Sequence, residues 1–274
     1  MHVGLSLFAT DLTNDIRDVA RAAEEAGFES LWVAEHTHIP VSRQTPYPMG
    51  EGDLPHEYAH TLDPFVALTA AAVVTDRLRI GTGICLVTER DPVVLAKEVA
   101  SLDRLSGGRF EFGVGAGWNV EEMADHGVAF EHRWDVLRDR VKLMQALWTN
   151  DVGEYDGDHA NVSPSWQWPK PVQDPVPILV GGGGKRPMRH AVEYGTGWLP
   201  MPSRQKFGER LGELAEIAAE VGKPTPSVTL HAVRPDAGVL GHYAEMGIER
   251  AVLILPFQAD VLAVVRDWAA LIPR

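Results

Sequence analysis

Short apolar segments alternate with longer amphipathic segments along nearly the whole chain. Eight apolar segments have the length of a strand and are bounded by polar residues or glycine. The segments between them have helical spacing. In the first of these, Ile16, Val19 and Ala23 share one face, and Gly27 follows as a stop signal. We predict strands over 3–8, 30–34, 78–84, 110–114, 177–180, 197–199, 227–232 and 251–255.

Local start signals support a helix after most of these strands. Asp63 and Asp91 each precede a proline, the pattern of an N-cap followed by proline at the first helical position. Asn119, with Glu122 three residues later, predicts a capping box. We predict the longer helices over 13–26, 64–75, 92–106, 134–148, 185–194, 204–221, 236–246 and 258–271.

Eight strand–helix units within 274 residues predict a single (β/α)8 TIM barrel, with residues 1–274 as one α/β domain. The strands lack alternation of apolar and polar residues, which is typical of parallel strands covered by helices on the outside. An open, doubly wound sheet is the alternative. It is disfavoured because the strand number and the chain length both match a barrel.

Two insertions interrupt the regular alternation. The first, residues 36–61, follows the second strand and is too long for an ordinary βα loop, so we expect it to cover the site. The second, residues 150–174, precedes the fifth strand. It predicts a small hairpin that pairs 154–155 with 161–162, followed by a proline-rich return.

Charge and composition exclude several classes of protein. The chain has 25 Lys and Arg against 38 Asp and Glu, a net charge of −13, which disfavours binding to nucleic acid or to an anionic membrane. No apolar run is long enough to span a bilayer, and the first residues lack the features of a signal peptide. Cys85 is the only cysteine, so no intramolecular disulfide can form. We therefore expect a soluble, cytoplasmic protein.

The carboxyl ends of the strands, where barrel enzymes place their sites, are rich in glycine. Gly181, Gly182, Gly183 and Gly184 follow an apolar strand and precede a helix, a setting that favours binding of a phosphate group. A flexible turn is the alternative explanation. Neither this run nor the one at 113–117 has the spacing of a dinucleotide-binding fingerprint.

Glu35 and His36 end the second strand, where a histidine beside a carboxylate can act as a general acid or base. A packing histidine is the alternative. His36 and His38 also resemble a metal pair, but the later strand ends offer only His231 as a further ligand, so we predict no metal. Trp118 directly follows a strand end and suits a pocket wall. Cys85 suits a packed thiol.

Two long motifs resemble the bacterial luciferase-like flavin and deazaflavin oxidoreductases. They are DPVVLAKEVASLDRLSGGRF, from Asp91 to Phe110, and GVGAGWNVEE, from Gly113 to Glu122. The segments TPYP at 45–48 and WPKP at 168–171, together with the 181–184 glycines, resemble an actinobacterial-type subgroup expected to use the deazaflavin coenzyme F420. The resemblance covers nearly the whole chain and weakens after about residue 202.

The resemblance implies a barrel that binds its cofactor at the strand ends, and hydride transfer between F420 and a small organic substrate. It implies a cis peptide bond at Gly83–Ile84, with Gly83, Ile84 and Cys85 beneath the ring. His36 would move the proton, with Glu35 fixing its tautomer, and Trp118 would line the pocket. The other residues expected to bind the cofactor come from the end of the fourth predicted strand and from the glycine loop that would hold the phosphate. They are Gly115, Ala116, Gly117, Gly181, Gly182, Gly183 and Gly184.

Trp118 departs from the branch of this family that has a glutamate proton donor at that position, which disfavours a sugar-phosphate dehydrogenase. An FMN-dependent monooxygenase that uses oxygen and is served by a reductase is an alternative function. A non-catalytic flavin-binding barrel is another. Members of the family are commonly homodimers, so we expect a homodimer.

Overall fold

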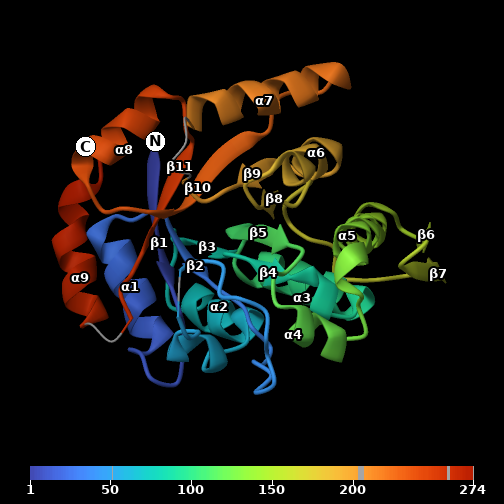
Figure 1. Cartoon of the computed structure of the whole chain (residues 1–274), viewed down its shortest axis with the longest axis horizontal. Coiled ribbons are helices and arrows are strands. Elements are labelled where there is room, and N and C mark those ends of the chain that lie inside the picture. Colours follow the sequence, from blue (N-terminus) through green and yellow to red (C-terminus); the bar gives the residue numbers. More distant parts are fainter. Residues whose placement is uncertain (51, 203–206, 258–259, 274) are drawn as a thin grey trace.

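Eight parallel strands close into a barrel in the computed structural model, which describes residues 1–50, 52–202, 207–257 and 260–273 (Figure 1). Each barrel strand pairs with the next, and the last returns to the first, with His2 opposite Arg250. The barrel strands are β1 (His2–Leu7), β2 (Ser30–Val33), β3 (Arg79–Thr82), β5 (Phe110–Gly115), β8 (Ile178–Gly181), β9 (Gly197–Leu199), β10 (Ser227–Val233) and β11 (Arg250–Ile254). The predicted barrel is confirmed, and the open sheet is wrong.

Helices surround the strands on the outside, as Figure 1 shows. They are α1 (Ile16–Ala26), α2 (Pro64–Ala72), α3 (Pro92–Leu105), α4 (Val120–Asp125), α5 (Arg133–Thr149), α6 (Lys185–Glu193), α7 (Phe207–Glu220), α8 (Ala237–Glu245) and α9 (Val261–Trp268). Asp63 and Asp91 cap α2 and α3 as predicted. The first helix begins at Ile16 rather than 13, because Asp15 is its cap. The predicted helix starts at 204 and 258 lie outside the described residues.

A small cluster of apolar side chains around Trp32 fills the interior of the barrel. Trp32 is fully buried and packs with Leu179, Leu199 and Val252. Gly81 on the neighbouring strand makes room for it, since a Cβ there would lie 2.5 Å from the Trp32 ring. The middle of the barrel is therefore closed, and a ligand can enter only from an end.

Ion pairs between buried and half-buried side chains close the amino-terminal end of the barrel. Arg250 lies 2.6 Å from Glu29 and 3.3 Å from Glu111, and Arg79 lies 2.5 Å from Glu111. Because these side chains satisfy one another, this end has a structural role, and the carboxyl end is left for chemistry.

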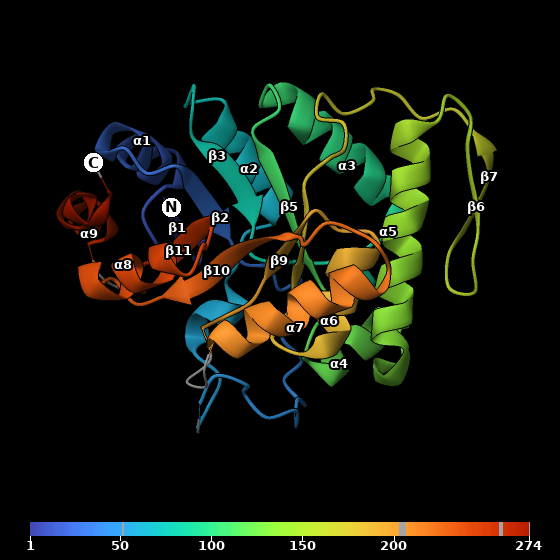
Figure 2. The ribbon, with the colours of Figure 1, turned by 90° about the horizontal axis from the view of Figure 1, so that it is seen from above.

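Both predicted insertions are present. The segment after β2 contains a short 3-10 helix, His56–Ala59, and projects from the same side of the barrel as α4 (Figure 2). The second insertion forms a hairpin of β6 (Gly153–Asp156) and β7 (Asn161–Ser165), with Tyr155 opposite Val162 as predicted. The predicted third strand is interrupted. It continues after Thr82 as β4 (Cys85–Leu86), which pairs with β5.

Candidate active site

A cavity of about 630 Å³ lies at the carboxyl ends of the barrel strands, beside the 36–61 insertion. Its position agrees with where barrel enzymes carry their sites. The residues that line it are Ser6, Phe8, Ala34, Glu35, His36, Tyr47, Met49, Glu57, Tyr58, Gly83, Ile84, Leu86, Trp118, Gly181, Gly182, Gly183, Leu199, Met201, His231, Ile254, Leu255, Pro256 and Phe257.

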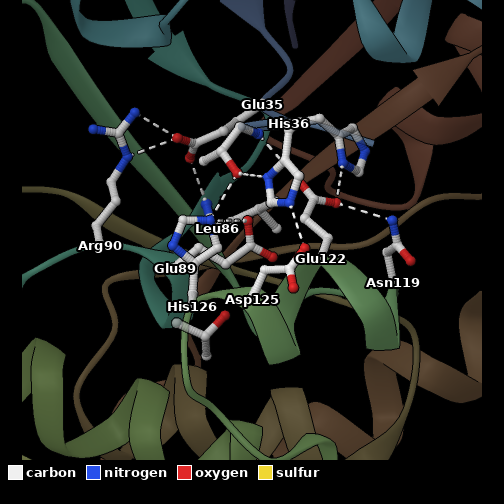
Figure 3. A network of polar contacts seen from close by, with 12 residues as sticks. Glu35, His36, Leu86, Glu89, Arg90, Asn119, Glu122, Asp125 and His126 are labelled. Atoms are coloured by element: carbon white, nitrogen blue, oxygen red, sulfur yellow. Dashed lines mark hydrogen bonds and ion pairs between the residues drawn. The ribbon is translucent and has the colours of Figure 1, made fainter. Parts of the chain in front are cut away.

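His36 is held in the cavity wall by a buried carboxylate. Its Nδ1 lies 2.7 Å from Oε2 of Glu122, and the two side chains are 6% and 0% exposed (Figure 3). Glu122 is in the first turn of α4, so this contact joins the ends of β2 and β5. The structure thus supplies His36 with an orienting partner 86 residues away along the chain.

Three donors converge on the Glu122 carboxylate. Besides His36, the backbone N–H of Thr37 donates to Oε1 at 3.0 Å and the amide of Asn119 donates to Oε2 at 3.2 Å. Burial acts to raise the pKa of Glu122, but the hydrogen bond from His36, its charge and the Thr37 N–H outweigh this and lower it. An ionised carboxylate can only accept, so Nδ1 of His36 carries a proton; in the neutral ring Nε2 is then the unprotonated nitrogen, which can accept a proton from a substrate.

Glu35 has a different role from the predicted one. Its carboxylate accepts from Arg90 Nε at 2.6 Å and from the Leu86 N–H at 2.6 Å, and Figure 3 shows it turned toward Arg90. Both Glu35 oxygens are engaged by Arg90 and Leu86, whereas Nδ1 of His36 is engaged by Glu122. The prediction that Glu35 fixes the tautomer of His36 is therefore wrong; Glu122 does so.

The predicted capping box is also wrong. Asn119 precedes α4, but its side chain accepts no N–H of that helix. Its amide instead donates to Glu122, whose carboxylate is already engaged with His36 and Thr37. Asn119 and Glu122 therefore form part of the site and do not cap the helix.

A second buried carboxyl lies behind this pair. Glu89 ends a short 3-10 helix (Val87–Glu89), and its side chain is 1% exposed. In the described part of the chain its Oε2 has no hydrogen-bond partner, and His126 Nε2 lies 4.0 Å away. Burial and the neighbouring charges of Glu122 and Glu35 raise the pKa of Glu89 to about 9. At neutral pH Glu89 is therefore protonated while Glu122 is ionised.

This raised pKa predicts a pH-dependent stability. Below the unfolded pKa of about 4.5 both folded and unfolded Glu89 are protonated, and only the unfolded form ionises between there and about pH 9. The free energy of unfolding should therefore fall over that interval. Gln mimics the protonated acid, so urea denaturation should show Glu89→Gln gaining stability over the wild type as pH rises from 5 to 9. A constant difference between the two proteins would contradict the assignment.

Aromatic rings form the wall around His36. The ring centroids of Tyr58 and Trp118 lie 5.2 Å and 5.7 Å from that of His36. Tyr58 also meets Tyr47, with the hydroxyls 3.4 Å apart, and burial raises the pKa of Tyr58 well above its usual range. Both tyrosines come from the 36–61 insertion, so this segment contributes walls to the cavity as well as length.

The floor of the cavity contains the Gly83–Ile84 peptide bond, which is cis, as the resemblance implied. His231 lies beside it and contacts Ser6 Oγ at 3.1 Å. Burial lowers the pKa of His231 to about 4, so this ring is neutral at pH 7. The three histidines considered for a metal have separate partners. They are Glu122 for His36, Ser6 for His231 and Asp125 for His38, whose side chain is 41% exposed.

The chain that carries this site matches a known protein family. The profile of the luciferase-like monooxygenases matches residues 6–235. The chain belongs to this family. Among its relatives is an uncharacterized protein of Mycobacterium tuberculosis that is 41% identical over 98% of both chains. Another is the F420-dependent glucose-6-phosphate dehydrogenase of Amycolatopsis mediterranei, 32% identical over 77% of this chain and 61% of the relative.

A solved structure shares the fold of the whole chain. An F420-dependent secondary alcohol dehydrogenase, in complex with an F420–acetone adduct, superimposes with a TM-score of 0.80. The match covers 99% of this chain and 98% of the other, at 20% identity. No helix within the described ranges combines the length and hydrophobicity needed to cross a bilayer.

The structure brings part of the predicted glycine set to the cavity. Gly181, Gly182 and Gly183 line the cavity, whereas Gly184 is the N-cap of α6. Gly182 has a φ of +120°, a conformation that favours glycine. A Cβ at Gly183 would face open space, so this loop leaves room for a group that approaches its backbone.

Four other residues, for which a contact with the cofactor was predicted, are not among the described residues that line the cavity. Cys85 packs in the core, where burial raises the pKa of its thiol. Gly115 makes room for Ile84, because a Cβ there would lie 1.8 Å from Ile84 Cδ1. Ala116 is buried, and Gly117 packs close to Met123. These residues shape the loop behind the cavity, and their predicted direct contact with a cofactor is not supported by the geometry.

Sequence reasoning missed Glu122, Glu89 and Tyr58 as members of the site. A signal for Glu122 existed. It lies four residues after Trp118, at the start of a helix that follows a strand end, where a side chain can face the carboxyl end of the barrel. No comparable signal marks Glu89 or Tyr58, because neither directly follows a strand.

Proposed function

We propose that this luciferase-like chain transfers a hydride between coenzyme F420 and a small organic substrate, an alcohol in one direction and a carbonyl compound in the other. The observation that carries the proposal is the His36–Glu122 pair in the cavity wall, since a hydride transfer of this kind needs one proton carrier beside it. The F420-dependent relative adds support for the cofactor.

The cavity fits a flat heteroaromatic ring with a phosphate-bearing tail. Its volume of about 630 Å³ is in the range of cofactor sites. Gly83 and Ile84 would contact one ring face, and the backbone of 181–183, next to the start of α6, would hold the phosphate. The open space at Gly183 is the cradle that a side chain would fill.

Bound F420 would accept or supply the hydride, while the chain positions the substrate and moves the proton. In alcohol oxidation, Nε2 of His36 takes the hydroxyl proton as the hydride leaves the carbon, and the reverse direction returns that proton to the carbonyl oxygen. Glu122 stabilises the resulting imidazolium through Nδ1–H. Tyr58 and Trp118 shield the pair from water.

Glu122→Gln should lower kcat by roughly one to two orders of magnitude, the range seen when a residue that orients a reactive group is lost. The amide can still bond His36 but can no longer stabilise an imidazolium. Steady-state kinetics measure the change, and Glu25→Gln, at an exposed position of α1 far from the cavity, is the matched control. Equal activity of both variants would contradict the role of Glu122.

Turnover tests the function itself. Purified protein is mixed with oxidised F420 and a panel of small alcohols, and with reduced F420 and the corresponding carbonyl compounds, and the deazaflavin absorbance is followed. We expect substrate-dependent conversion in at least one direction. Oxygen-dependent oxidation of substrate with reduced FMN, and none with F420, would instead identify a monooxygenase, the activity for which the family is named.

A further inference from the structure

A second group of chemically active side chains lies outside the cavity. We infer that His132, Asp135 and His159 form a surface site for a divalent transition-metal ion, best suited to Zn²⁺, which fastens the β6–β7 hairpin to α5. This inference is independent of the proposed function.

The three side chains converge from two separate elements. His132 directly precedes α5 and Asp135 lies three residues later, so both fall on one face of the helix start. His159 lies between β6 and β7, in the hairpin that runs beside α5 in Figure 2. One ligand atom of each residue lies within 4.8 Å of the others, and the two imidazole centroids are 5.6 Å apart. Two nitrogens and one carboxylate oxygen therefore lie close enough together to bind one ion after small side-chain rotations.

The hairpin is already held where the site needs it. Asp139, one turn after Asp135, accepts the backbone N–H of His159 at 2.9 Å. The same carboxylate accepts the Tyr155 hydroxyl at 3.2 Å, and its side chain is 3% exposed. The main chain of His159 is thus fixed against α5 before any ion binds, and only side-chain rotation is left. Such preorganisation reduces the entropic cost of coordination.

The donor set matches zinc chemistry. Two imidazoles with one carboxylate, and an open fourth position for water, is a common tetrahedral arrangement. At zinc–ligand distances of about 2.0–2.1 Å the ligand atoms must approach to roughly 3.4 Å. The contraction from the present separation requires small rotations, for which the exposed rings of His132 and His159 have room.

One cation already competes for the site. Arg186 lies 3.3 Å from each oxygen of Asp135, with half of its side chain exposed. An exposed ion pair contributes little to stability, so its loss opposes metal binding only weakly. A second candidate for binding an ion is the pair His56 and His60, whose Nε2 atoms are 3.1 Å apart. That pair offers two ligands, whereas three converge at His132, Asp135 and His159 within the described chain.

The test is a Zn²⁺ titration of tag-free, metal-stripped protein by isothermal calorimetry at about pH 7.5, where an unperturbed imidazole is neutral. We expect one equivalent to bind and to raise Tm. His159→Ala should weaken binding at least about tenfold and abolish the rise in Tm, since it removes a direct ligand. His60→Ala, the matched control, should bind as the wild type does.

Other outcomes decide against the site. No zinc binding by the wild type, or equal binding by His159→Ala, would overturn the inference. Binding that is lost in His60→Ala and kept in His159→Ala would assign the ion to the pair His56 and His60. Because His159 is exposed, its loss should leave the Tm of the metal-free protein unchanged, so a folding defect does not confuse the comparison.

Discussion

His36→Ala should lower kcat by about two to four orders of magnitude, the usual contribution of a positioned acid or base. The variant removes the proton carrier that Glu122 holds at 2.7 Å, and water excluded by Tyr58 and Trp118 cannot readily replace it. Affinity for the cofactor should change by less than about threefold, because the phosphate loop at 181–183 is untouched. Steady-state kinetics with F420 measure kcat, and fluorescence titration measures the affinity for the cofactor.

His38→Ala is the matched control. His38 is also a histidine of the 36–61 segment, but it is an exposed side chain paired with Asp125 and does not line the cavity. Its variant should retain wild-type kcat within about threefold. Full activity of His36→Ala, or an equal loss in both variants, would remove His36 from the proton-transfer role.

Arg90→Met should destabilise the protein by about 3–5 kcal/mol, the cost typical of leaving a buried charge without its partner. Arg90 binds Glu35, whose side chain is 1% exposed, and also reaches Asp63 and Glu98. Met keeps much of the volume of the arginine stem beside Phe65, where the guanidinium now packs. The unpaired Glu35 carboxylate would then remain buried with the Leu86 N–H as its donor. Urea denaturation at pH 7 measures the loss.

A double variant separates charge from packing. Glu35→Gln removes the buried negative charge, so Glu35→Gln combined with Arg90→Met should be more stable than Arg90→Met alone. A double variant that is less stable than Arg90→Met would show that packing, and not the unpaired charge, accounts for the effect.

The fold could be predicted largely because local signals agreed with one another. Asp63 and Asp91 before proline, glycine after helices and eight apolar strands all pointed to the same barrel. The predictions failed at single boundaries. The third strand breaks at the cis peptide bond after Thr82, and the first helix begins where Asp15 caps it, features decided by geometry that an apolar pattern does not record.

The site was predictable in position but not in pairing. His36, Trp118 and the 181–183 glycines line the cavity because each follows a strand end, a rule that holds for the whole fold. The position of α4 relative to β2 decides which carboxylate contacts His36. Glu35 was wrongly favoured over Glu122 because it is adjacent to His36 in the sequence. The raised pKa of Glu89 follows from its burial beside Glu35 and Glu122. These three residues come from separate segments of the chain and meet only in the folded protein.

The most direct test of hydride transfer with F420 is a parallel binding titration of the purified protein with F420 and with FMN, each followed by the fluorescence of its ring. We expect saturable binding of F420 at micromolar concentration or tighter, with FMN at least about tenfold weaker, a difference of about 1.4 kcal/mol. Preferential binding of FMN, or binding of neither, would contradict the proposed function.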